Sequence, residues 1–236
     1  MKLLAMDTSG PVCGVAVLAG PGIVYECAVQ NKLTHSVNLV PMMEAALQAT
    51  GLALADLDGI AVVVGPGSFT GVSTGVSTAK GLAHGSGLPC LPVNALEAMA
   101  AGIQDFDGLV CPVQDARAGQ VYGAAFAVRG GNPERLMPDT PLKVEDYAEA
   151  LLKLGGRFLF LGDGMPPHRE KLAALLGEKA VFAPAQLAFL RPASVAYLAA
   201  AHPERAVDYA ALMPLYLRAP SAERNRRLAE AMAHEQ

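Results

Sequence analysis

The stretch that most constrains the fold is a glycine-rich corner, Gly65-Pro66-Gly67-Ser68-Phe69-Thr70-Gly71, together with the helix expected over 72–85. The corner follows an apolar, β-branched run at 60–64, which predicts a buried strand. Such a corner is a natural anion site, because free N–H groups and the positive end of the helix dipole point out of it. From the residue types, a phosphate cradle and a structured contact loop are favoured equally.

The expected helix carries a stripe of very small residues at Gly71, Gly75, Ala79 and Ala83, which recur every four positions. One side of this helix is therefore almost without side chains. Glycine within a helix lowers stability, so its presence indicates that something approaches the helix backbone closely. We interpret the stripe as a surface for helix packing against a partner.

The corner matches neither of two common phosphate-binding motifs. A Walker A loop needs a lysine directly after its last glycine, and the nearby Lys80 falls in mid-helix. The Rossmann spacing would require glycine where Thr70 stands. Ser68 or Thr70 is a suitable N-cap, and Phe69 in so polar a loop indicates a packing anchor.

Composition excludes several functions. The chain has 236 residues, 52 % of them hydrophobic, and a formal charge of -4, which gives no global attraction to nucleic acid. Met1–Asp7 does not resemble a signal peptide, and no apolar run is long enough for a membrane span. The four cysteines lack C-x-x-C spacing, so we expect buried thiols in a cytoplasmic protein without a metal or redox role.

The order of expected elements predicts an α/β fold with mixed sheets. Each half of the chain begins with strands and continues with alternating helix and strand. We place the boundary in the turn-rich stretch at 102–108. The predicted organisation is an N-terminal lobe over 1–102, a smaller C-terminal lobe over 103–214 and a tail over 215–236. The two lobes are related in pattern, although no motif recurs at a fixed period.

Two aspartates follow expected strands and precede turns or helices. Asp7, in Asp-Thr-Ser-Gly, is placed to hold a phosphate or a magnesium-bound water, and Asp163, in Gly-Asp-Gly, is placed to face it across a cleft. Both sequences are also ordinary turns, which is the favoured interpretation.

The sequence gives less support to a metal site or to nucleophilic catalysis than to these turns. No histidine has a second one three or four positions later, and one turn after His35 stands Leu39. His35 is therefore expected to be a capping or interface residue. Ser68 lacks the G-x-S-x-G elbow of a nucleophilic serine. The arginines of the tail, Arg224, Arg226 and Arg227, lie among glutamates, which favours a solvated helical face.

Several short motifs occur together in a fixed order, and together they resemble the bacterial TsaB (YeaZ) family. They are Asp7-Thr8-Ser9, Thr34-His35-Ser36, Gly65–Gly71, Ala79-Lys80-Gly81-Leu82-Ala83, Asp115-Ala116-Arg117 with Val121-Tyr122, and Tyr216-Leu217-Arg218. This resemblance implies a two-lobed, actin-like (ASKHA, ribonuclease H-like) fold. It implies a role in N6-threonylcarbamoylation of adenosine 37 in tRNAs that read ANN codons.

The resemblance also implies that the chain is a non-catalytic subunit that scaffolds and activates the catalytic subunit TsaD. The ATPase TsaE is expected to join this complex, tRNA is expected to be met only through it, and the isolated chain is expected to form homodimers through the same face. No cofactor and no metal are expected, since the family's H-x-x-x-H pair of TsaD is represented here by His35 and Leu39. The expected partner interface comprises Gly65, Pro66, Gly67, Ser68, Phe69, Thr70, Gly71, Val72, Gly75, Val76, Ala79 and Ala83, with His35, Leu39 and Met43.

One position departs from the family pattern. An arginine usually follows the glycine corner and its next residue, and Ser73 stands there in this chain. Serine offers one hydroxyl in place of five donors and a fixed charge.

The alternative function is a small-molecule kinase or ATPase of the same fold, in which Asp7 and Asp163 would bind magnesium-ATP. A metallopeptidase ranks below this alternative.

Overall fold

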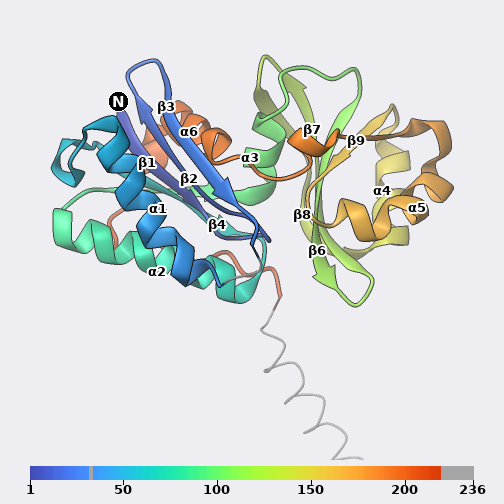
Figure 1. Cartoon of the computed structure of the whole chain (residues 1–236). Helices are drawn as coiled ribbons and strands as arrows, with labels where there is room; N and C mark the ends of the chain where they lie inside the picture. The colour runs from blue at the N-terminus through green and yellow to red at the C-terminus, as the bar shows by residue number, and fades with distance from the viewer. Residues whose placement is uncertain (32–33, 219–236) are drawn as a thin grey trace, which may run out of the picture.

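The computed structural model describes residues 1–31 and 34–218, and it contains two five-stranded mixed sheets (Figure 1). The first has the order β3-β2-β1-β4-β5 and the second β10-β9-β6-β7-β8. The first sheet consists of β1 (Lys2–Asp7), β2 (Cys13–Ala19), β3 (Gly22–Val29), β4 (Gly59–Gly65) and β5 (Cys90–Asn94). The second consists of β6 (Leu109–Arg117), β7 (Gln120–Arg129), β8 (Asn132–Lys143), β9 (Phe158–Leu161) and β10 (Ala180–Phe182).

The two sheets share one topology. In each, the first three strands along the chain are antiparallel neighbours, and the fourth and fifth run parallel to the first. Each sheet therefore has the order third, second, first, fourth, fifth. The two halves, which were predicted to be related in pattern, therefore share a strand topology without sharing a sequence repeat.

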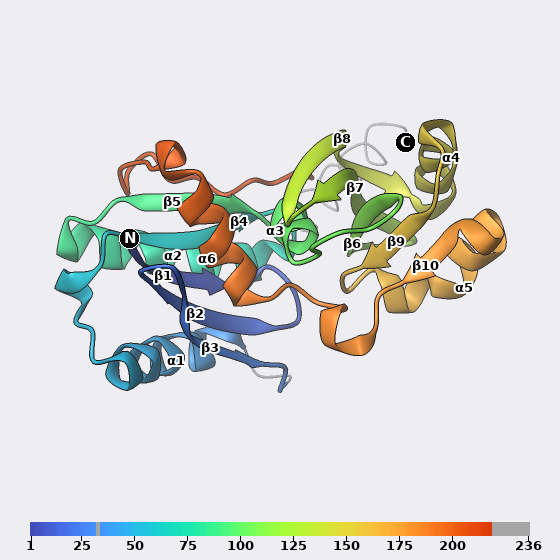
Figure 2. The same cartoon turned by 90° about the horizontal axis from the view of Figure 1, so that it is seen from above.

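In the described part of the chain, six α-helices complete the layers (Figures 1 and 2). Helices α1 and α2 cover the outer face of the first sheet, α4 and α5 cover the outer face of the second, and α3 and α6 pack between the two inner faces. Their bounds are α1 (His35–Thr50), α2 (Phe69–Ser86), α3 (Ala95–Ala101), α4 (Val144–Leu154), α5 (Met165–Leu176) and α6 (Pro192–Ala201). Among the described residues, no helix is long and apolar enough to span a membrane.

Alternation along the strands builds these layers. Leu3 and Ala5 of β1 face the inner core, whereas Leu4 and Met6 face α1 and α2. Since both faces are covered, the strand needs apolar residues at every position, which is why the central strands are nearly continuous apolar runs.

One strand, β8, has no clear signal in the sequence. The stretch Gly130-Gly131-Asn132-Pro133 is typical of a loop, but β8 pairs with β7 along most of its length. It contains Pro133, Pro138 and Pro141, which lack an N–H donor. Proline is tolerated in a strand at a sheet edge, and β8 is an edge strand. The prolines argue against a strand in the sequence, and the structure tolerates them because β8 lies at the sheet edge.

The chain returns to the first sheet after residue 190. Helix α6 packs on β1 and β2, and Leu212 is buried in the outer core of the first sheet. We therefore propose that 192–214 belongs to the first lobe, although it was predicted in the second. We also propose that the boundary between the lobes lies near residue 102. The tail residues 219–236, including Arg224, Arg226 and Arg227, lie outside the described residues.

The glycine stripe of α2 faces the protein's own sheet. A Cβ added at Gly71 would lie 2.0 Å from the carbonyl oxygen of Thr8, and one added at Gly75 would lie 2.6 Å from Thr8 Oγ1. Ala79 and Ala83 are fully buried in the same core. The stripe does permit a close approach, as predicted, but the approaching group is the end of β1. The interpretation that it points at a partner is wrong for these residues.

We expect Gly71→Ala to lower the free energy of unfolding by about 3 kcal/mol, because the added methyl overlaps a backbone oxygen that side-chain repacking cannot move. The matched control is Gly81→Ala in the same helix, where an added Cβ meets nothing within 4 Å. That change should stabilise the protein by about 0.5–1 kcal/mol. Urea unfolding measures both, and equal effects would contradict this account.

Candidate functional site

The glycine corner is held by internal hydrogen bonds. The N–H of Ser68 donates to the carbonyl of Ser9 (2.8 Å), and Ser68 Oγ accepts from the N–H of Gly71 (3.3 Å), as expected of the N-cap of α2. Thr8 Oγ1 donates to the carbonyl of Gly71 (2.7 Å). Several N–H groups that could have bound a phosphate are thus already engaged. Of the two interpretations left open, this geometry favours the structured contact loop.

The segment Leu215–Arg218 lies over this corner and joins it to the second sheet. The N–H of Leu215 donates to the carbonyl of Val64 (2.7 Å), and the Tyr216 ring packs on Phe69 with centroids 4.7 Å apart. Arg218 Nη1 donates to the carbonyl of Ala116 (3.2 Å). We call residues 215–218 the strap.

Ser73 acquires a role from the strap. Its Oγ lies 2.6 Å from the hydroxyl of Tyr216 and also donates to the carbonyl of Phe69 (2.8 Å). The position where the family pattern expects arginine therefore holds a small hydroxyl that bonds to the strap. The sequence contains no signal for this contact, because 143 positions separate the two residues.

The predicted interface residues fall into two groups. Only a minority lie at the surface: Ser68, Phe69 and Thr70 are exposed, and Gly67 and His35 are half-buried. The others are buried in this chain, namely Gly65, Pro66, Gly71, Val72, Gly75, Val76, Ala79, Ala83, Leu39 and Met43. Most of the residues predicted for the interface are therefore covered by the chain itself and are not available to a partner.

The outward faces of α1 and α2 contain different residues. Val37 and Val40 of α1 are 57 % and 46 % exposed, and Phe69 at the start of α2 is 46 % exposed. Along α2, Ser77, Gly81 and Gly85 are exposed and recur every four positions. The same periodicity that revealed the inward stripe therefore contained an outward one, in the opposite phase.

A second group of polar residues lies between the two lobes. Asp7 and Ser9 from the end of β1 meet Gln114 from β6 and Asp163 from the turn after β9, around a cavity of about 10 Å³. Apolar residues close the same cavity, namely Pro11, Val12, Met99, Phe189 and Leu190. The two aspartates therefore line one interlobe site, which corresponds to the less favoured of the two interpretations of their sequences. Gln114 was missed, because nothing in its sequence context marks it.

Burial dominates the electrostatics of this site. It raises the pKa of Asp7 to about 6, although the backbone N–H of Ser9 donates to its Oδ1 (2.8 Å) and opposes the shift. Burial raises the pKa of Asp163 to about 7, and the charges of Asp115 and Asp7 add to it. Among the described residues, Ser9 Oγ, both amide atoms of Gln114 and Asp163 Oδ1 have no hydrogen-bond partner.

The cavity limits what the site can hold. About 10 Å³ suits a single water molecule, whereas drug-sized ligands occupy some 300–1,000 Å³. His35 is directed elsewhere, with Nε2 2.9 Å from the carbonyl oxygen of Gly10, and Leu39 is buried one turn later. Within residues 1–31 and 34–218, no three His, Cys, Asp or Glu side chains gather to hold a metal.

The fold and site together define a class of protein. Two mixed sheets of identical strand order, with an aspartate at the end of β1 and an interlobe site beside it, are the architecture of the two-lobed actin-like ATPase fold. The family model described as TsaD, tRNA N6-adenosine threonylcarbamoyltransferase, matches residues 15–234.

Individual relatives narrow this further. The tRNA threonylcarbamoyladenosine biosynthesis protein TsaB of Bacillus subtilis is 36 % identical over 94 % of this chain and 96 % of its own length. The protein of the same name from Escherichia coli is 35 % identical over 70 % of this chain and 72 % of its own. The structure of YeaZ from Pseudomonas aeruginosa superposes with a TM-score of 0.75 at 26 % identity, covering 92 % of this chain and 99 % of that one. The chain belongs to the TsaB (YeaZ) family.

The buried carboxyl of Asp163 makes stability depend on pH. Because its pKa is about 7 in the folded chain and near 3.8 when unfolded, the folded state binds the proton more tightly. The free energy of unfolding should therefore fall as pH rises from about 4 to about 7. We expect Asp163→Asn to raise it by about 1–3 kcal/mol at pH 8 and to flatten its decline.

The control is Asp107→Asn, which removes an exposed carboxylate. Urea unfolding between pH 5 and pH 8 should give this variant the slope of the parent protein. If Asp163→Asn retained the parent slope as well, burial of Asp163 would not be the source of the pH dependence.

Proposed function

We propose that this chain is a non-catalytic subunit in the biosynthesis of N6-threonylcarbamoyladenosine at position 37 of tRNAs that read ANN codons. In this role it scaffolds and activates the catalytic subunit TsaD, TsaE joins the complex in the cytoplasm, and the isolated chain forms homodimers. The observation that carries the proposal is the end-to-end likeness to the B. subtilis TsaB protein.

The interlobe site supports a role without chemistry in this chain. Met99, Phe189 and Leu190 occupy the space beside Asp7 and Asp163, and the remaining cavity of about 10 Å³ is far too small for a nucleotide. The formal charge of -4 also supports contact with tRNA through the complex instead of through this chain alone.

The partner surface that we propose is the outward face of α1 and α2. Val37, Val40 and Phe69 offer exposed apolar area, and the stripe Ser77, Gly81 and Gly85 lets a second helix approach closely. The hydroxyls of this face suit burial, because those of Thr74 and Thr78 donate to the carbonyls four residues earlier. Their donors would be satisfied inside an interface.

Gly81→Leu is expected to abolish homodimers and binding to TsaD while leaving the fold intact. An added Cβ at Gly81 meets nothing within 4 Å in the monomer, whereas a leucine would hold a partner helix away. Analytical ultracentrifugation measures both associations, and tRNA from a strain carrying the variant should lose most of its N6-threonylcarbamoyladenosine.

The matched control is Ala174→Leu on the exposed side of α5, which adds comparable bulk outside the proposed surface. It should leave association and tRNA modification unchanged. Full assembly of the Gly81→Leu variant would remove the outward face of α2 from the proposal.

The alternative function, a small-molecule kinase or ATPase, is not favoured by the closed interlobe site. Calorimetric titration of the isolated chain with magnesium-ATP should give no saturable heat. Tight, magnesium-dependent binding that Asp7→Ala abolishes would overturn the non-catalytic assignment.

A further inference from the structure

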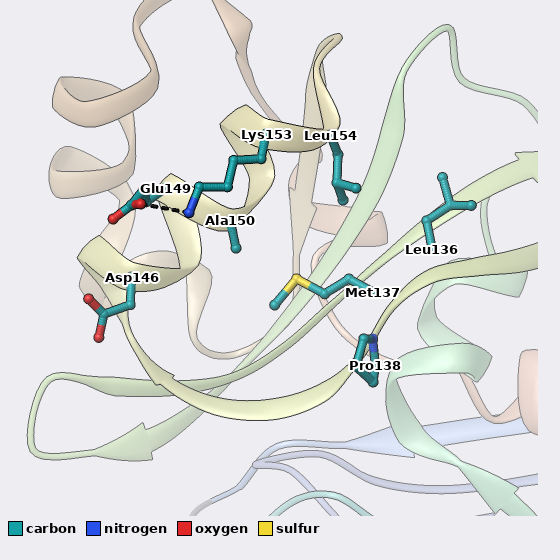
Figure 3. Close-up of a pocket in the computed structure, with 8 residues that line it drawn as sticks. All are labelled: Leu136, Met137, Pro138, Asp146, Glu149, Ala150, Lys153 and Leu154. Carbon is teal, nitrogen blue, oxygen red and sulfur yellow. Dashed lines mark ion pairs between the residues drawn. The ribbon is translucent and has the colours of Figure 1, made fainter.

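An apolar groove lies on the far side of the second lobe, between α4 and the edge strand β8 (Figure 3). It has a volume of about 410 Å³. Met137 and Ala150 face each other across it, and Leu136 and Leu154, each 45 % exposed, stand at one end. Exposed apolar area gathered in a groove indicates a binding surface.

Charged residues border this groove in a definite order along α4. Asp146 and Glu149 lie toward the start of the helix, and Lys153 lies one turn further on. Glu149 and Lys153 form an exposed ion pair at 2.8 Å (Figure 3), and pairs of this kind contribute little to stability. The two carboxylates therefore lie at the end of the groove where α4 begins, apolar residues lie along its middle, and the Lys153 ammonium is held against Glu149.

The described chain ends close to the acidic end of the groove. Arg218 donates to the carbonyl of Ala116, at the turn between β6 and β7. At that turn Gln120 pairs with Lys143, and α4 begins at the next residue. Two strand spacings, about 10 Å in all, separate the backbone at Ala116 from the start of α4, and Arg218 reaches Ala116 with the tip of its side chain.

The remaining chain has a matching order of residues. Segment 219–236 carries Glu223 and three arginines first, namely Arg224, Arg226 and Arg227, then Leu228 and Met232 on either side of Glu230, and finally Glu235. Eighteen residues span about 27 Å even as a helix, against about 16 Å for α4. The segment can therefore reach the whole groove from Arg218.

We infer that the groove between α4 and β8 is the docking site of the chain's own C-terminal segment, 219–236. The arginines meet Asp146 and Glu149, Leu228 and Met232 fill the apolar middle, and Glu235 meets Lys153. This surface lies away from the outward face of α1 and α2, so the docked segment and a partner subunit occupy different sides of the molecule.

The test uses the full-length chain and amide hydrogen exchange. Docking predicts slowed exchange in 222–233 and in α4. Reversing the basic end with Arg224→Glu, Arg226→Glu and Arg227→Glu should speed exchange in 222–233 by about tenfold. Adding Asp146→Lys and Glu149→Lys to the same chain should restore the protection, because the opposite charges meet again. A methyl–methyl NOE between Met137 and Met232 should accompany protection.

The matched control carries Glu170→Lys and Glu178→Lys, which change the charge of the second lobe equally but lie outside the groove. It should leave exchange unchanged. The inference is overturned if 219–236 exchanges at the rate of a free peptide in the parent chain. It is equally overturned if protection grows with protein concentration, since a second copy would then occupy the groove.

Discussion

The contact between the end of β1 and the first turn of α2 is the constraint on which the rest of the fold depends. Thr8 reaches the backbone of α2 so closely that only glycine fits at Gly71 and Gly75, and hydrogen bonds from Thr8 and Ser68 fasten the contact on both sides. This contact sets the angle at which α2 crosses the first sheet. It therefore also decides which residues of α2 face outward.

The interlobe site combines two buried carboxyls with an apolar lining. Asp7 and Asp163 still line the site between the lobes, but apolar side chains fill the space around them. Burial disfavours the charged form of both carboxyls, which is the main physical reason for their raised pKa values. The same filling lets α3 and α6 join both inner faces in one continuous core.

Local signals predicted much of this fold, and contacts between distant segments account for what they missed. The strand predicted over 60–64 and the helix predicted over 72–85 correspond to β4 and α2, because an apolar run and a glycine-rich corner mark them in the sequence. Strand β8 was missed because its prolines are compatible with a strand only at an edge, and a sequence does not show where the edge is. The stripe of α2 was found but misassigned, since periodicity identifies a face and not the group that the face meets. Gln114 and the Ser73–Tyr216 contact left no local signal.

The first sheet is completed by residues far along the chain from its own strands. Helix α6 covers its inner face, and Tyr216 reaches Ser73 across 143 positions. On the ribosome, β1 to β5 therefore emerge long before the segments that cover them, and the corner around Phe69 is finished only when nearly the whole chain is available. Contacts between positions so far apart close large loops and form late in folding. A truncated chain thus presents neither a covered core nor a finished corner, so the mature surface is restricted to chains that are essentially complete.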